Sequence, residues 1–483
     1  MSDPSAKQLP AVTVYITSHN YGRFLPEAIE SVLRQGRADW ELIVTDDGSG
    51  DDSAAIARSY AARDPGRIRV VVNPEPLGLR HCANEALRLA RGRYFMRLDA
   101  DDYLDESALE VLAGYLDRHP EWGLVFPNWT YVSEEGGFLG VERRRLLGRE
   151  VRVLDLPPHG ACTMVRRRVI KAVGGYDPVH DSQDGHELWL KILHRYPVGN
   201  VETPLFFYRQ HGASLSLDEE RLLAARQRIK RAEVERHRGA VEPRVVAIVP
   251  ARNRGGKLEG RLREPLAGQP LLDYTLRAAT GVGLCETVFV TTDDPAVREH
   301  CADWPGVEAY LRPESLSAPR VRLAEVVADA VRALEEEQGI FPDLLVVLSV
   351  HSPLRQPEHI REAVDTLRLY EVDQVISVYE DLDLHFQHGP DGLVALNPGA
   401  LQELRFEREA LLVDNGAVHA LWREALDPSD LHAGRLGHIV MPRDRSLQLK
   451  TPADWDLAER LLGGGGLSQG REASAPHSVS PDR

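Results

Sequence analysis

The chain is poor in cysteine, in basic charge and in long apolar runs. Its four cysteines show no Cys-x-x-Cys pair and no histidine at zinc-site spacing, which argues against a disulfide framework or a zinc site. The net charge of -16 argues against a nucleic-acid backbone as the main partner. No run approaches the roughly 18 apolar residues of a membrane span, and no basic stretch leads into an apolar core near Met1. We therefore expect a cytoplasmic protein without a membrane span.

The length of 483 residues allows two large domains. Over 10–215, short apolar strands such as VTVYIT and ELIVTDD alternate with amphipathic helices such as PEAIESVLRQ, which predicts a mostly parallel sheet. The same pattern restarts with RVVAIVPARN and fills 244–462. We expect 216–243 to be a helical linker, either solvated and packed on its own domain or bound to a membrane surface or partner. The tail 463–483 lacks apolar content, so we expect it to be disordered.

The two halves echo one another. VYITSHN and VAIVPARN each open a half as a strand that runs into a polar loop, and IVTDDG and FVTTDDP each end a later strand on paired aspartates. The echo fails where the first half has RLDADD and the second has VLSVHSP. It suggests one superfold used twice, although it is too weak to establish an internal repeat.

Three carboxylates, Asp99, Asp101 and Asp102, stand at the end of the expected strand YFMRLD. Like charges a few ångströms apart repel, so such a cluster is costly unless it is solvated or neutralised. Mg²⁺ or Mn²⁺, bound by carboxylate oxygens and substrate phosphates, fits this pattern. The alternative is a helix N-cap, because Asp102 or Asp105 could cap the helix that begins in ESALEVL.

Five motifs in order carry a family resemblance over 10–215: TVYITSHNYGRFLPEAIESVL, WELIVTDDGSGDDS, NPEPLGLRHCANEAL, GRYFMRLDADDYL and GGYDPVHDSQDGHELWLKI. With them the first half resembles the family 2 glycosyltransferases of the GT-A fold. The resemblance implies a Rossmann-like, nucleotide-diphosphosugar transferase domain that uses Mn²⁺ or Mg²⁺ and inverts the anomeric centre. It favours UDP as the donor base and leaves open a glycan, lipid-linked, protein or small-molecule acceptor.

The resemblance also assigns roles to single residues. Thr17 and Asp47 match the family's contacts to the base of the donor. Asp101 matches the contact to ribose or phosphate, Asp102 matches the direct ligand of the metal, and Asp99 completes the motif.

Three further residues follow, two in the motif GGYDPVHDSQDGHELWLKI and one in the later segment YRQHGASLS. Asp184 matches the catalytic base, although Gln183 replaces the usual glutamate before it; a carboxylate opposite the leaving diphosphate can take the acceptor's proton. The alternative for Asp184 is a surface carboxylate before a helix. His211 resembles a metal-site position near the diphosphate, with a histidine bound to a loop carbonyl as the alternative. Trp189 follows helical spacing and is predicted to lie in the core rather than to contact the acceptor.

The second half, 244–462, resembles the cytidylyltransferases that make CMP-activated acidic sugars such as sialic acid and Kdo. The motifs are VVAIVPARNRGGKLEGRL, VFVTTDDPAV, YLRPESLS, VLSVHSPLRQPEHI, VDNGAVHAL and MPRDRSLQLKTPADW. The resemblance implies a second GT-A-type domain and pairing of two copies through it. The residues placed in its nucleotide site are Arg252, Lys257, Arg261, Asn415 and Lys450.

The last motif departs from that family, whose RSIDIDTEED carries two metal-binding aspartates. Gln448 and Lys450 stand in their places. Their alternation with Leu447 and Leu449 predicts a strand with an amide and an ammonium on one face. Because both charge and ligands are lost, we expect metal-dependent attack on CTP to be lost too. Either Lys450 contacts a phosphate or carboxylate directly, or the strand has drifted.

The favoured hypothesis is therefore one working glycosyltransferase joined to a cytidylyltransferase-like domain that serves binding, oligomerisation or acceptor positioning. One alternative is a bifunctional enzyme that both makes a CMP-activated acidic sugar and transfers a sugar. The other is a non-catalytic scaffold that binds nucleotide sugars.

Overall fold

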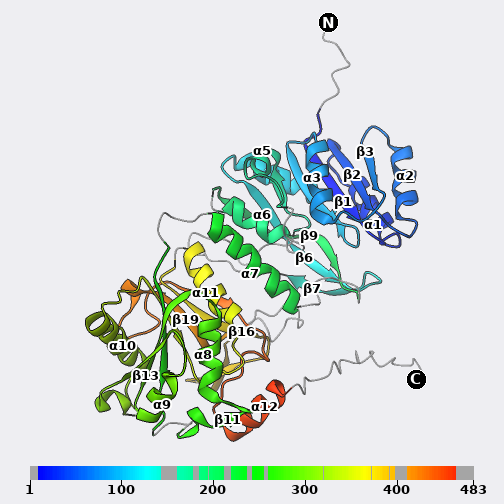
Figure 1. Cartoon of the computed structure of the whole chain (residues 1–483). Coiled ribbons are helices and arrows are strands. Elements are labelled where there is room, and N and C mark those ends of the chain that lie inside the picture. Colours follow the sequence, from blue (N-terminus) through cyan, green and yellow to red (C-terminus); the bar gives the residue numbers. More distant parts are fainter. Residues whose placement is uncertain are drawn as a thin grey trace, which may run out of the picture. The chain divides into compact units, whose positions relative to one another are not determined.

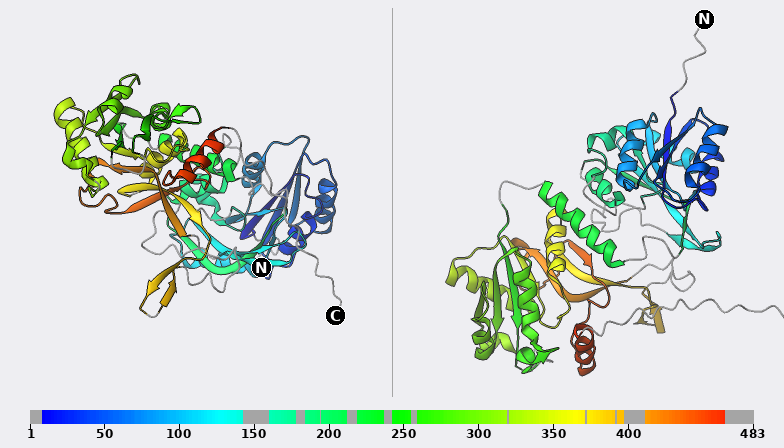
Figure 2. Two further views of the ribbon diagram at one scale, coloured as in Figure 1. Left: turned by 90° about the horizontal axis from the view of Figure 1, so that it is seen from below. Right: turned by 45° about the vertical axis from the view of Figure 1, so that its right-hand side comes forward.

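The computed structural model describes residues 9–142, 160–177, 184–193, 195–211, 219–236, 242–254, 259–318, 320–370, 372–390, 392–396 and 411–463. Its contacts divide the chain into two compact units, unit 1 (Met1–Arg238 and Asp381–Leu411) and unit 2 (Gly239–Glu380 and Leu412–Arg483). Each unit combines helices with its own large sheet (Figure 1; two further views in Figure 2). None of the helices in these ranges combines the length and the apolar content needed to cross a membrane.

Unit 1 is built on a nine-stranded sheet of order β3-β2-β1-β4-β8-β6-β9-β5, with β7 paired to β6. Its strands are β1 (Val12–Ser18), β2 (Trp40–Asp47), β3 (Ile68–Asn73), β4 (Tyr94–Asp99), β5 (Tyr103–Leu104), β6 (Leu124–Val132), β7 (Phe138–Glu142), β8 (Met164–Arg166) and β9 (Val198–Arg209). Its helices are α1 (Leu25–Leu33), α2 (Ser53–Arg63), α3 (Leu79–Leu89), α4 (Ala108–Arg118), α5 (Arg167–Ala172), α6 (Asp184–Leu193) and α7 (Glu219–Arg236). A hairpin of β17 (Phe386–Gly389) and β18 (Gly392–Ala395) belongs to the same unit.

The centre of this sheet is buried on both faces. On one face Val14 of β1 lies opposite Leu42 of β2 and Met96 of β4, and all three belong to the core. On the other face Tyr15 stacks on Phe95 with ring centroids 4.7 Å apart. Parallel strands covered on both sides need apolar residues at successive positions, which explains the near-continuous apolar runs in the sequence.

Unit 2 is built on a seven-stranded sheet of order β14-β13-β10-β15-β19-β16-β20. Its strands are β10 (Val245–Ala251), β11 (Pro265–Leu266), β12 (Gln269–Pro270), β13 (Cys285–Thr292), β14 (Val307–Leu311), β15 (Leu344–Leu348), β16 (Gln374–Asp381), β19 (Leu411–Trp422) and β20 (Leu436–Val440). Its helices are α8 (Leu271–Gly281), α9 (Pro295–Cys301), α10 (Leu323–Gln338), α11 (Pro357–Leu369) and α12 (Pro452–Leu462), with 3-10 turns η2 (Arg261–Arg263), η3 (Glu314–Ser317) and η5 (Arg423–Ala425).

The two sheets share a topology. β3-β2-β1-β4 and β14-β13-β10-β15 are each a run of four parallel strands in the same order. Each run continues with an antiparallel strand, β8 in unit 1 and β19 in unit 2. The predicted fold class of two Rossmann-like α/β domains in tandem is therefore confirmed.

The polar segment between the two patterns forms helix α7. It packs against α6 of its own unit, and Ile229 and Val234 on it are buried. The last described residue is Gly463, so the predicted disorder of 464–483 concerns residues outside the described ranges.

Candidate active site

The carboxylates of RLDADD lie in the turn between β4 and β5. Asp99 is the last residue of β4, and the N–H of Asp102 donates to the Asp99 carbonyl at 3.2 Å. β5 then pairs antiparallel with β9, with Tyr103 opposite Phe207. This pairing brings the turn against the end of β9, because Arg209 follows Phe207 by two residues.

Asp102 is the most enclosed of the three, with 1% of its surface exposed. Its Oδ1 accepts a hydrogen bond of 2.9 Å from the backbone N–H of Arg209, whereas its Oδ2 is buried and has no hydrogen-bond partner. Burial, followed by the charges of Asp101 and Asp99, raises the pKa of Asp102 well above its ordinary value. The sequence alternative, in which Asp102 caps a helix, is not what its contacts show.

His211 lies with these carboxylates. Its Nε2 shares a hydrogen bond of 3.0 Å with Oδ2 of Asp101, and its ring packs against Phe24 and Tyr21 with centroids 5.2 and 5.9 Å away. Burial and the charge of Asp99 raise the pKa of Asp101, an effect that the hydrogen bond with His211 partly offsets. The structure thus brings His211 into contact with Asp101.

Asp99 forms an ion pair with Arg97 on the same strand. A Cβ on Gly160 would lie 3.2 Å from the Arg97 guanidinium and 3.7 Å from the Cα of Gly185. The start of α6, of which Asp184 is the first residue, is therefore close to the end of β4. The side chain of Asp184 and the residue before it lie outside the described part of the chain.

Thr17 and Trp189 occupy two different environments. Thr17 pairs with Asp99 across β1 and β4, and its buried Oγ1 has no hydrogen-bond partner. A hydroxyl without a partner at the carboxyl end of the sheet is available to a ligand. Trp189 is 1% exposed and meets Phe126 edge to face, so its predicted place in the core is confirmed.

Asp47, at the end of β2, holds a loop. Its carboxylate accepts hydrogen bonds from Asn73 Nδ2 at 2.8 Å and from the N–H groups of Leu77 and Gly78, each at 2.9 Å. Burial alone would raise the pKa of Asp47, but these hydrogen bonds hold it below its ordinary value. Asp47 therefore stays ionised, and both of its oxygens already accept protein hydrogen bonds.

Two residues of the site were missed in the sequence. The guanidinium of Arg209 contacts a carboxylate oxygen of Glu27 at 2.5 Å and donates to the carbonyls of Asp101 at 2.9 Å and Glu134 at 2.6 Å, so it ties α1, the β4–β5 turn and the segment after β6 together. Burial and the three carboxylates raise the pKa of Tyr21 to about 12. The sequence could have indicated both, because Arg209 stands in YRQHGASLS with His211 and Tyr21 follows the first strand in TVYITSHNYGRF.

The site fits a divalent cation that is completed by its substrate. Among the residues that the structure describes, no group of three or more His, Cys, Asp or Glu side chains is arranged to hold a metal ion by itself. Mg²⁺ is usually bound by only one or two carboxylates together with substrate phosphates and water. The unpartnered Oδ2 of Asp102 and the raised pKa of both Asp101 and Asp102 show negative charge that the protein itself leaves uncompensated.

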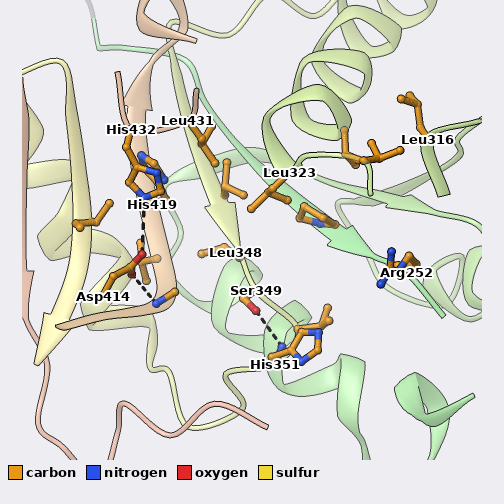
Figure 3. A pocket seen from close by; sticks show the side chains of 18 of the residues that line it. Arg252, Leu316, Leu323, Leu348, Ser349, His351, Asp414, His419, Leu431 and His432 are labelled. Carbon is orange, nitrogen blue, oxygen red and sulfur yellow. Dashed lines mark hydrogen bonds and ion pairs between the residues drawn. The ribbon is translucent and has the colours of Figure 1, made fainter. Parts of the chain in front are cut away.

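Unit 2 holds a cavity of about 480 Å³ at the carboxyl ends of β10 and β15. Arg252 and Arg312 line it, together with His351 and with Asp414 and His432, which lie 3.7 Å apart (Figure 3). Among the described residues that line this cavity Asp414 is the one acid, whereas unit 1 has three carboxylates together. Where β4 is followed by aspartates, β15 is followed by a serine and a histidine.

The predicted strand at Gln448 and Lys450 is not a strand. Residues 443–446 form a turn, and Leu449 then pairs only with His351, donating to its carbonyl at 2.8 Å. The Gln448 amide donates to the Asn415 carbonyl and lies over Gly416. Lys450 is exposed and is not among the residues that line the cavity.

Of the four described residues among those predicted for the second nucleotide site, only Arg252 lines the cavity. Arg261 lies over the Trp455 ring, 5.3 Å from its centroid. Asn415 is 2% exposed; its Oδ1 accepts from the Ser377 hydroxyl at 2.6 Å, and its Nδ2 donates to Ser446 Oγ at 2.9 Å, so its side chain serves the fold. Lys257 lies outside the described residues.

Comparisons with known proteins agree with both halves. Residues 13–174 match the model of the family described as glycosyl transferase family 2, and residues 246–385 match the model described as cytidylyltransferase. The chain thus carries a family 2 glycosyltransferase domain followed by a cytidylyltransferase domain. Both resemblances, and with them the prediction of an enzyme of the glycosyltransferase class, are confirmed.

Curated relatives fall into the same two groups. The putative glycosyltransferase EpsE of Bacillus subtilis is 29% identical over 42% of this chain and 73% of its own length. The CMP-N,N'-diacetyllegionaminic acid synthase of Legionella pneumophila is 25% identical over 45% of this chain and 96% of its own length. Other relatives are much longer: the chain spans 14% of the uncharacterised protein y4gI of Sinorhizobium fredii and 19% of the chondroitin synthase of Escherichia coli. The structure of S. aureus TarS with UDP-GlcNAc is 16% identical over 48% of this chain and 68% of its own, at a TM-score of 0.40, too low to support an argument.

Proposed function

We propose that the first half is an inverting, metal-dependent glycosyltransferase. It moves a sugar from a nucleoside-diphosphate donor, with UDP favoured as the common base in the family, to an acceptor hydroxyl or other nucleophile. Thr17 and Asp47 serve the base of the donor. The observation that supports this proposal is the carboxylate cluster with the buried Asp102, which lies inside the region that matches the family 2 model and is joined by His211 from beyond it.

Asp102, Asp101 and His211 are the residues that would hold the divalent cation, which when bound stabilises the charge that develops on the leaving diphosphate. Asp184 takes the proton of the acceptor while the new oxygen–carbon bond forms opposite the breaking bond to phosphate. The backbone N–H of Arg209 fixes Oδ1 of Asp102, so that Oδ2 remains directed to the ligand.

The test is calorimetric binding of UDP, GDP, dTDP and CTP to the full chain with and without Mn²⁺, followed by transfer assays with the diphosphate sugar that binds. Asp102→Ala should abolish Mn²⁺-dependent binding, and Asp184→Ala should abolish transfer while leaving binding unchanged. Asp105→Asn is the matched control, because its carboxylate lies outside the cluster and bonds to Ser107. Unchanged transfer in both alanine variants would refute this assignment of the site residues.

For the second half we propose a role in binding, pairing of two copies or positioning of the acceptor, without turnover of CTP. This is supported by Gln448, whose amide is bonded within the fold at the place of a metal-binding aspartate of the resembled family. The check is release of pyrophosphate from CTP by the native chain with Mg²⁺ and an acidic sugar such as N-acetylneuraminate. Release at a rate that rises with enzyme concentration would favour the bifunctional alternative.

A further inference from the structure

The cavity of unit 2 has a positively charged wall without ion pairs. Arg312 and Arg252 both line it, and among the described residues neither guanidinium forms an ion pair with a carboxylate. Arg312 is 7% exposed, and its Nε donates to Ser317 Oγ at 3.1 Å; Nη1 of Arg252 reaches only the Ala318 carbonyl, at 3.5 Å. A buried guanidinium without a carboxylate is costly, so this wall gains from an anion.

The two arginines also act on each other. Burial lowers the pKa of Arg312. The carboxylate of Asp293 raises it, the charge of Arg252 lowers it, and the charge of Asp329 raises it by less. Asp293 is itself engaged, because it accepts the N–H of Asn253 at 2.7 Å and that of Arg254 at 3.3 Å. It therefore offsets the two cations only in part.

Apart from Asp414, which pairs with His432 at 3.7 Å, the rest of the described lining is apolar or neutral. Leu323, Leu348 and Leu431 form much of it, and Figure 3 shows His419 and His432 on the side away from Arg252. Burial, followed by the charge of His432, lowers the pKa of His419 to about 3, so this ring is neutral at physiological pH. A volume of about 480 Å³ is within the range of small-molecule sites. The cavity thus suits a small-molecule ligand that carries one anionic group.

The place where the resembled family holds a metal is filled by the protein. The φ of Gly416 is +60°, and a Cβ on it would lie 2.4 Å from Nε2 of Gln448, so this amide is packed directly on the backbone. Leu449 is fixed by two contacts with His351, its N–H at 2.8 Å from the carbonyl and its own carbonyl at 3.0 Å from Nδ1. Gln448 and Lys450 supply no carboxylate at the two places of the metal-binding aspartates, and Asp414, the one carboxylate among the described lining residues, is paired with His432 at 3.7 Å. The residues present therefore do not fit a divalent cation.

We propose that this cavity binds a small ligand bearing a phosphate or a carboxylate through Arg252 and Arg312, without a divalent cation. The inference rests on the proposal that the second half does not turn over CTP. Guanidinium groups supply both positive charge and paired N–H donors to such oxyanions, which is the part that a metal plays elsewhere.

The test is calorimetry on the full chain with three probes, CMP, inorganic phosphate and N-acetylneuraminate, each in Mg²⁺ and in EDTA. The titrations are repeated in an Asp102→Asn background, so that a metal-dependent nucleotide site in the first half does not contribute. At least one probe should bind with a Kd that changes less than about twofold in EDTA. Binding of CMP and phosphate identifies a phosphate ligand, and binding of N-acetylneuraminate alone identifies a carboxylate ligand.

Arg252→Gln should weaken that binding at least about tenfold, and Arg312→Lys, which keeps the charge, should weaken it less. Arg435→Gln is the control, because Arg435 is exposed, pairs with Asp373 and does not line the cavity. Failure of all three probes to bind, or a tenfold loss in EDTA, would overturn the inference. The Mn²⁺-dependent binding of a donor to the first half is measured separately, so each proposal can be refuted without affecting the test of the other.

Discussion

Replacing Asp102 by asparagine should stabilise the metal-free protein. The carboxylate is 1% exposed, only Oδ1 accepts a hydrogen bond, and Asp101 and Asp99 repel its charge. Asparagine keeps an acceptor for the N–H of Arg209 and removes the negative charge that burial and the neighbouring carboxylates disfavour. The variant therefore removes a destabilisation of the folded state that the wild-type protein retains because the carboxylate is needed to bind the ligand.

The expected gain follows from the loss of this buried charge. Burying a polar group without compensation costs about 1–3 kcal/mol, and 1 kcal/mol shifts the Tm of a domain of this size by about 2–4 °C. Asp102→Asn should thus raise the metal-free Tm by about 2–12 °C. The pKa of Asp102 is raised in the fold, so the wild-type protein loses stability as pH rises through that pKa and the carboxylate ionises. Asparagine does not titrate, so the difference in Tm between the variant and the wild type should widen with pH.

Calorimetric unfolding of the full chain in EDTA and in Mn²⁺ measures both effects. In Mn²⁺ the wild-type protein should gain about 2.7 kcal/mol at a concentration of 100 Kd, whereas Asp102→Asn should gain almost nothing. Asp105→Asn, in which the remaining oxygen still accepts the N–H of Ser107, should behave like the wild type in both conditions. A metal-free Tm of Asp102→Asn below that of the wild type, with the control unchanged, would refute the reasoning.

Three further outcomes are expected. Protons compete with a cation for Asp101 and Asp102, whose pKa values are raised, so the Tm increase caused by Mn²⁺ should shrink as pH falls from 8 to 5.5; an increase that is constant with pH would contradict this. Arg209→Lys keeps the charge but loses the forked contacts to Asp101 and Glu27, so transfer should fall about 10–100-fold and the Kd for Mn²⁺ should rise. Steady-state kinetics against a Mn²⁺ titration measure both quantities, and unchanged values would mean that these contacts are dispensable. Gln448→Ala removes the bond to the Asn415 carbonyl and should lower the free energy of unfolding of unit 2 by about 1–2 kcal/mol in urea titration without changing transfer; a loss of transfer would connect the second half to catalysis.

The sequence was most informative where chemistry coincides with the end of a parallel strand. Asp99 and Asp102 could be placed because apolar runs of strand length show where β4 stops, and carboxyl ends of parallel strands gather at one edge. The partners of Arg209 could not be placed in this way, since Glu27 is 182 residues away and only the fold brings the two together. Alternation also misled at Leu449, because an extended loop with one buried and one exposed side gives the same pattern as a strand, although its only backbone pairing is with His351.

The shared topology of the two units indicates where their chemistry separates. Asp47 at the end of β2 and Asp293 beyond the end of the equivalent β13 both accept backbone N–H groups of a nearby loop, so these echoed aspartates do similar structural work in each half. The difference lies one strand further across each sheet. β4 leads into Asp101 and Asp102, which are left with negative charge that a cation would relieve. β15 leads into His351, which is tied to the neutral Leu449 segment beside two guanidiniums that form no ion pair within the described residues. One strand position, occupied by acids in one unit and by neutral side chains in the other, therefore separates a site suited to a metal and a diphosphate from one suited to an anion alone.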